Sequence, residues 1–187
     1  VQLMHSQGAR PWESSCVAMT FDFPAPEVEA RIPRSRGLCR EFAARHDIRQ
    51  VYDLNLGIGA HVMLELGLMQ PGQIVLGCGR CMHLGGAVGA LVLGAEPGLL
   101  ARAVTSGRYA LRTPPVAHVR FDGQRRPSVS AYDMGLAACQ AVGALSAETI
   151  LEFVGKAVEA LPMDGRITLV DVAAAGFRAG LVPADAV

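Results

Sequence analysis

Short apolar segments alternate with segments of helical periodicity along most of the chain. Apolar or alternating residues predict strands at residues 16–21, 50–54, 74–76 and 118–121. Apolar residues that recur every three or four positions predict helices at residues 35–46, 60–68, 85–93, 99–105, 130–142, 146–161 and 168–179. Ser35 and Ser130 are suitable N-cap residues for two of these helices. The chain is therefore expected to contain strands and helices in alternation.

The order of these elements predicts an α/β fold. Strands that alternate with helices form a parallel or mixed sheet with helices on both faces, which gives three α/β/α layers. Residues 1–15 are mostly polar and contain Gly8 and Pro11, so we expect an N-terminal arm followed by a single domain over residues 16–187. Functional side chains in such folds gather at the carboxyl ends of strands. The segment after residues 74–76 occupies such a place.

Composition excludes several classes of protein. Hydrophobic residues make up 51% of the 187 residues and charged residues 18%, which excludes a disordered chain. The formal net charge is zero and aromatic residues make up 5%, so we expect neither a nucleic acid nor a membrane as a partner. The longest uncharged apolar run, residues 82–95, is shorter than the roughly 20 residues of a membrane span and predicts a buried helix.

The N-terminus and the cysteines predict a cytoplasmic protein. The chain begins with Val1 and shows no charged segment followed by an apolar stretch, as a signal peptide would. Its five cysteines are an odd number and follow no disulfide framework. We therefore expect reduced thiols and a cytoplasmic location.

The most unusual local cluster is Cys78-x-x-Cys81-x-His83. Two thiolates and an imidazole at this spacing are typical zinc ligands, and two cysteines so spaced near a helix start are typical of redox dithiols. A single reactive thiol at Cys81, beside Arg80, is a third interpretation, and two small buried residues are a fourth. Because a structural zinc site needs four ligands and no second pair of cysteines follows, we expect no metal.

Two further residues are candidates for proton transfer. His61 lies on the apolar face of the helix predicted at residues 60–68, where a histidine is either part of the core or a catalytic group. Asp22 follows the first predicted strand and precedes Pro24, where its carboxylate either reaches a pocket or stabilises the turn. Spacing alone thus predicts a pocket that contains thiols and nothing more specific.

Several motifs follow one another in an order that is more informative than any of them alone. They are Tyr52-Asp53-Leu54-Asn55, Gly59-x-His61-Val62, Glu65-x-Gly67-Leu68-x-Gln70-Pro71-Gly72, Gly86-Ala87-x-Gly89-Ala90 and Met163-Asp164-Gly165-Arg166-Ile167-Thr168-Leu169. From about residue 19 to the C-terminus the chain resembles the aconitase superfamily, and within it the large subunits of 3-isopropylmalate dehydratase. The resemblance implies an aconitase-like α/β/α domain and water addition or removal on a di- or tricarboxylate with a [4Fe-4S] cluster.

The chain departs from the family pattern where the family's chemistry lies. The family's Asp-His pair reads Asp22-Phe23, and its Asp-Ser-His-Thr tetrad aligns with residues 79–82, which places Cys81 at an active-site histidine. The family's glutamate before the segment that begins at Gly176 is replaced by alanine, whereas His61 stands at a family histidine. We also expect the region with the three cluster cysteines and the swivelling domain to be missing.

These departures predict a pared-down lyase or isomerase of specialised metabolism that needs no cofactor. It would act on a small carboxylate- or carbonyl-bearing metabolite by isomerisation, dehydration or cyclisation. The predicted catalytic residues are Cys81, His61 and Asp22, and the predicted substrate-binding residues are Arg80, Cys78, Asn55 and His83. One alternative is a subunit of a split hydro-lyase whose partner supplies a [4Fe-4S] cluster, and another is a non-catalytic binding protein. We also expect a homo-oligomer, formed through faces that pack on other domains in the family.

Overall fold

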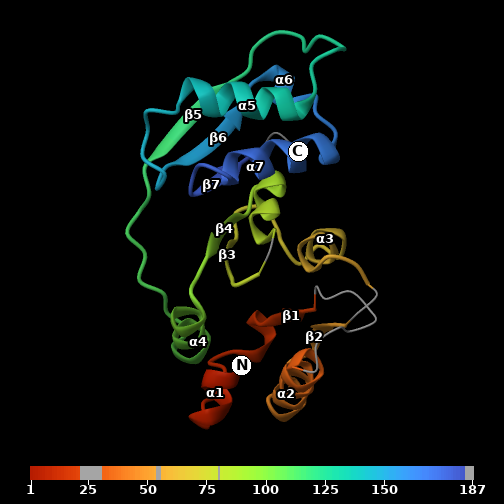
Figure 1. The fold of residues 1–187 in the computed structure, drawn as a ribbon, viewed down its shortest axis with the longest axis vertical. Helices are drawn as coiled ribbons and strands as arrows, with labels where there is room; N and C mark the ends of the chain where they lie inside the picture. The colour runs from red at the N-terminus through yellow and green to blue at the C-terminus, as the bar shows by residue number, and fades with distance from the viewer. Residues whose placement is uncertain (22–30, 54–55, 80, 184–187) are drawn as a thin grey trace. The chain divides into compact units, whose positions relative to one another are not determined.

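The computed structural model describes residues 1–21, 31–53, 56–79 and 81–183, with the backbone alone described at residues 31–34. Figure 1 shows the described helices and strands, coloured in chain order from red to blue. The chain divides into two compact units, of which the first is residues 1–62 with 95–111 and the second is residues 63–94 with 112–187. Within the described part of the chain, no helix is long and apolar enough to cross a membrane.

The first unit combines short helices with a pair of parallel strands. Its elements are α1 (Gln2–Ser6), η1 (Ser14–Cys16), β1 (Ala18–Thr20), α2 (Arg31–Arg45), β2 (Gln50–Tyr52), α4 (Pro97–Ser106) and the first part of α3 (Gly59–Glu65). Its core consists of the buried residues Met4, Phe42, Ala43 and Ile48. Residues 1–15 therefore contain a helix and contribute a core residue, and the single domain at residues 16–187 stays a prediction.

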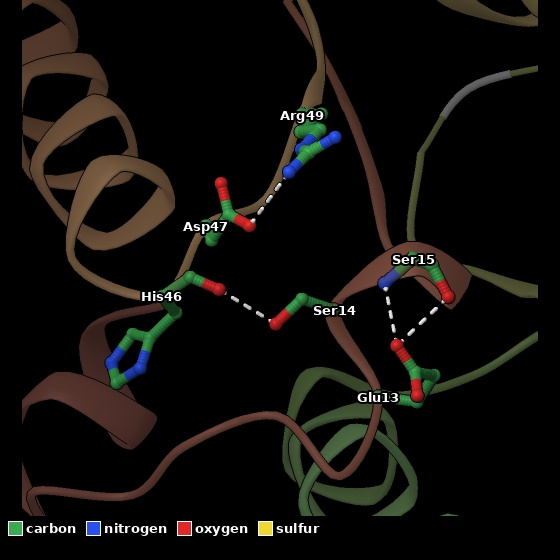
Figure 2. Close-up of polar contacts among 6 residues, drawn as sticks. All are labelled: Glu13, Ser14, Ser15, His46, Asp47 and Arg49. Atoms are coloured by element: carbon green, nitrogen blue, oxygen red, sulfur yellow. Dashed lines mark hydrogen bonds and ion pairs between the residues drawn. The ribbon is translucent and has the colours of Figure 1, made fainter.

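Polar contacts join the N-terminal segment to the end of α2 (Figure 2). Asp47 follows α2 with a left-handed backbone conformation (φ 51°), which is a common way to end a helix. The hydroxyl of Ser14 in η1 donates a hydrogen bond to the carbonyl of His46 over 2.6 Å. The carboxylate of Glu13, the N-cap of η1, accepts hydrogen bonds from the backbone N–H and the hydroxyl of Ser15. The bond from Ser14 thus attaches the segment before β1 to the C-terminal end of α2, and the bonds to Glu13 stabilise η1 itself.

The second unit contains the other described strands, all paired in parallel. Its elements are β3 (Ile74–Gly77), η2 (Met82–Val88), β4 (Leu91–Gly94), β5 (Val116–Arg120), α5 (Ala131–Ala141), β6 (Ile150–Val154), α6 (Lys156–Glu159), α7 (Met163–Ala174) and β7 (Ala179–Leu181). Strand β3 pairs with β4, and β5, β6 and β7 form a second sheet in that order. The parallel pairing confirms the predicted α/β fold, although the described strands form several small sheets rather than one.

The core of the second unit lies where α7 packs against α5, β7 and η2 (Figure 1). Its largest fully buried side chains are Leu93, Leu151, Phe153, Val158, Leu169, Val170 and Val182. Burial of one such side chain stabilises a fold by roughly 1.5–3 kcal/mol. Helix α5 begins with a capping box in which Ser130 and Asp133 bond to each other's backbone N–H, as the N-cap prediction at Ser130 requires. Helix α5 is therefore fixed at its N-terminal end as well as along its buried side.

Two segments that we predict as helices contain strands. Residues 82–95 form η2, a turn at Gly89 with a left-handed backbone (φ 78°), and strand β4. Residues 146–161 contain β6 before the short α6. These two helix predictions are wrong because periodicity cannot distinguish the short apolar run of a buried strand from a buried helix. The helix predicted at residues 168–179 is confirmed as far as Ala174, where α7 ends, and its last residue begins β7.

Candidate functional site

The segment that follows β3 holds the densest group of predicted site residues. Strand β3 ends at Gly77, Cys78 is exposed, and Cys81 is partly buried at the start of η2. Cys81 has a left-handed backbone (φ 59°), which is uncommon for a residue with a side chain. Its carbonyl accepts a hydrogen bond from the N–H of Leu84 over 3.1 Å, which closes the first turn of η2. The segment lies at the carboxyl end of a parallel pair of strands, as predicted.

Helix η2 is held against β7 by an unusually close backbone approach. A Cβ atom at Gly86 would lie 2.0 Å from the carbonyl oxygen of Gly180, so a side chain cannot be accommodated there without movement of the backbone. The N–H of Val182 donates a hydrogen bond to the carbonyl of Gly86 over 2.9 Å. Gly86 therefore fixes the residues of η2, and with them the segment after β3, relative to the second sheet.

His83 in η2 is paired with a carboxylate that sequence analysis missed. Its Nε2 lies 2.7 Å from Oδ1 of Asp171 in α7, and the two side chains are 29% and 57% exposed respectively. Asp171 is 88 residues away in the chain and shows no motif or spacing that relates it to His83. Only the packing of α7 on η2 brings the pair together.

The structure describes four of the seven predicted site residues. Cys78, Cys81 and His83 follow β3 within six positions and belong to the second unit. His61 lies in α3, half-buried between the core residues Ala60 and Val62, and belongs to the first unit. The remaining three predicted site residues lie outside the described residues: Asp22, Asn55 and Arg80. The predicted roles of all seven stay predictions.

A cavity of about 450 Å³ lies near the carboxyl ends of β5 and β6 and was not predicted. Within it, Nδ1 of His118 lies 3.1 Å from a carboxylate oxygen of Glu152, which stands opposite it in the sheet. The lining residues are His118, Arg120, Glu152, Val154, Gly155, Glu159 and Pro183. None of the four predicted site residues that the structure describes is part of this lining.

The described residues do not form a metal centre by themselves. None of the five cysteines forms a disulfide bond within the described structure, and no group of three or more described His, Cys, Asp or Glu residues is arranged to hold a metal ion. Burial raises the pKa of the Cys139 thiol, which points toward the carbonyl of Val172 and is therefore a poor thiolate ligand. An iron–sulfur cubane requires at least three thiolates. The described cysteines thus do not fit such a cluster without further ligands.

Comparisons with known proteins give one consistent family. The profile of the aconitase family (aconitate hydratase) matches residues 26–187. The chain is 31% identical over 182 residues to a 3-isopropylmalate dehydratase large subunit of Methanoregula boonei, with 96% of this chain and 44% of the relative covered. It is 34% identical over 180 residues to a homoaconitase large subunit of Thermus thermophilus, with 93% of this chain and 42% of the relative covered. The chain thus spans less than half the length of these relatives.

These matches overturn the prediction that no cofactor is involved. The dehydratases of the matched family carry a [4Fe-4S] cluster, and the match extends through both units of the chain. The alternative prediction, in which the cluster is supplied from outside this chain, is the one that agrees with both the matches and the described cysteines.

Proposed function

Because the chain belongs to the aconitase family, we propose that it forms one part of a hydro-lyase whose [4Fe-4S] cluster is held by thiolates outside these 187 residues. The substrate in this proposal is a small di- or tricarboxylate with a hydroxyl group, as the names of the related dehydratases suggest. The overall reaction is the reversible removal of water, in which a C–H and a C–OH bond are lost and a carbon–carbon double bond forms.

The observation that carries this proposal is the family match over residues 26–187 together with the close contact of η2 with β7. Gly86 belongs to a motif of the family resemblance, and the space around it admits no side chain. The scaffold that positions the segment after β3 is thus retained, although the residues of the segment itself differ from the family pattern. Because the contact of Gly86 with Gly180 leaves no room for a side chain, its retention supports the proposal that the segment after β3 is still a functional site.

In this proposal the residues after β3 bind the substrate and move a proton. Cys81 is the proposed acid–base group, because a thiol with a suitable pKa can exchange protons with a bound substrate. Cys78 and His83 flank Cys81 as proposed substrate-binding residues, and Arg80 is a third. The proton-transfer roles predicted for His61 and Asp22 and the binding role predicted for Asn55 stay predictions. The described residues fit no cluster by themselves, so no step of this proposal passes through one.

A partner subunit is also part of the proposal. The related proteins are named as large subunits, which supports assembly with another polypeptide. The predicted homo-oligomer, the cytoplasmic location and a place in specialised metabolism remain predictions.

The proposal is tested by the dehydration of 3-isopropylmalate by the protein purified anaerobically with the polypeptides that accompany it. We expect turnover, and we expect Cys81→Ala to lower it by roughly a hundredfold, because loss of an acid–base group typically costs that much. Cys16→Ala is the matched control, since this exposed thiol lies in η1 of the first unit and its loss should leave turnover unchanged. Absence of turnover with 3-isopropylmalate and with homoaconitate would overturn the proposal.

A further inference from the structure

The pairing of His83 with Asp171 differs from the other pair of a histidine with a carboxylate that is described in the second unit. His118 and Glu152 are neighbours on adjacent strands, and their contact follows from the register of the sheet. His83 and Asp171 instead come from η2 and α7 and meet only through tertiary packing. Both side chains remain partly exposed, so the pair is accessible to a bound molecule.

The contact determines which ring nitrogen of His83 carries the proton. An ionised carboxylate only accepts hydrogen bonds, so Nε2, which lies 2.7 Å from Oδ1 of Asp171, must be the protonated nitrogen. In the neutral ring Nδ1 then has a free lone pair. Within the described residues no other hydrogen bond is made by the His83 ring, so Nδ1 is available as a proton acceptor.

The backbones of His83 and Asp171 are fixed because their neighbours in the chain are part of the buried core. Leu84, next to His83, is 3% exposed, and Gly86 is held against Gly180. Asp171 lies between Val170 and Val172, which are both buried. The backbones that carry the imidazole and the carboxylate therefore cannot move apart without disrupting the core. A pair held in this way is arranged before any ligand binds, which is what efficient proton transfer requires.

We propose that His83 is the proton acceptor for a hydroxy-carboxylate substrate and that Asp171 is the positioning residue that fixes its tautomer. This inference rests on the proposed function. Nδ1 forms a new N–H bond with the proton of a carbon next to a carboxylate, and the electron pair of the broken C–H bond enters the new double bond. The hydroxyl group leaves with its own electron pair and takes up the proton of the Cys81 thiol, the acid–base group of the proposed function, so that one water molecule is released. The proton on Nδ1 then returns to the Cys81 thiolate, which restores both groups. Between these events the carboxylate of Asp171 stabilises the imidazolium ion.

The first test is the tautomer of His83, which does not depend on activity. Nitrogen-15 spectra of the histidine rings in mildly alkaline buffer, with His83→Gln for assignment, distinguish a protonated from a bare Nδ1. We expect a bare Nδ1 in the natural protein and a mixture of tautomers in Asp171→Asn, because an amide can donate to Nε2 as well as accept from it. Asp164→Asn, an exposed carboxylate at the start of α7, is the control. A protonated Nδ1 in the natural protein, or an unchanged ratio in Asp171→Asn, would refute the inference.

The second test is the effect on turnover of 3-isopropylmalate by the complete assembly. We expect Asp171→Asn to lower kcat by at least roughly tenfold with little change in KM, because the base is misoriented while binding contacts remain. Asp164→Asn should leave kcat unchanged. A full kcat in Asp171→Asn would overturn the role of the pair. If the natural assembly shows no turnover, the proposed function fails, whereas the spectra still decide whether Asp171 fixes the tautomer.

Discussion

At the scale of single residues, close contacts rather than residue types decide what the chain tolerates. Gly86 and Gly176 are both glycines of the second unit, yet a Cβ at Gly86 would lie 2.0 Å from a backbone oxygen, and a Cβ at Gly176 would meet nothing within 4 Å. The sequence shows the first as part of a motif but does not show that it touches Gly180, since that contact joins η2 to β7. Asp171 was missed for the same reason, because its partner lies far away in the chain.

Substitution of Gly86 by alanine should therefore destabilise the protein. We expect the free energy of unfolding to fall by roughly 1–3 kcal/mol, the usual cost of forcing extra atoms into a packed site. Urea denaturation measures the change, with Gly176→Ala as the control that should have little effect. Equal effects of the two substitutions would show that η2 does not approach β7 so closely.

The capping box of α5 predicts a pH-dependent stability. Hydrogen bonds from Ser130 lower the pKa of Asp133, so the folded state favours the ionised carboxylate. This stabilisation is present above the ordinary pKa of an aspartate and is lost as pH falls through the lowered pKa of the folded state. Ser130→Ala should thus lower the free energy of unfolding at neutral pH, and the difference should shrink as pH falls below the ordinary pKa of an aspartate. Urea denaturation across this range measures the difference, and a difference that is independent of pH would contradict the capping box.

At the scale of elements, local sequence patterns predicted the helix and the strand that carry a clear signal, such as an N-cap residue or a short apolar run. Ser130 marked the start of α5, and the run Ile74-Val75-Leu76 marked β3. Strands β4 and β6 were predicted as helix because their short apolar runs are equally typical of buried helices. Their state is decided by pairing with strands distant in the sequence, as in the contact of Ile150 with both Val116 and Ala179.

Strand β6 should accordingly be the most sensitive element of the second unit. Leu151, its second residue, is fully buried and pairs with Ala117 of β5 and Gly180 of β7. We expect Leu151→Ala to lower the free energy of unfolding by about 2–5 kcal/mol, because the substitution leaves a cavity in the core. Leu145→Ala is the control, since Leu145 is exposed and its loss should cost within about 0.5 kcal/mol. Thermal or urea denaturation of both variants measures the difference, and similar losses would place Leu151 outside the core.

At the scale of the whole molecule, family membership corrects the prediction, made from the residues around Cys81, that the protein needs no cofactor. The altered residues around Cys81 led to the prediction of an enzyme without a cofactor, because Cys78 and Cys81 are too few thiolates to hold a cubane. The match over residues 26–187 shows instead that the chain belongs to a family of cluster-dependent dehydratases, of which it spans less than half the length of the relatives compared. The proposed function accordingly assigns the cluster ligands to thiolates outside the chain, since the described residues hold no group that fits a metal ion by itself.

Iron and acid-labile sulfide per chain, measured on anaerobically purified protein, test this central claim most directly. The measurement is made on this 187-residue chain alone and on the assembly with the polypeptides that accompany it. We predict no cluster on the chain alone, and near-stoichiometric iron and sulfide together with dehydratase turnover in the assembly. A cluster bound by the chain alone would contradict the claim that its ligands lie elsewhere, and an assembly without iron would contradict the proposed hydro-lyase.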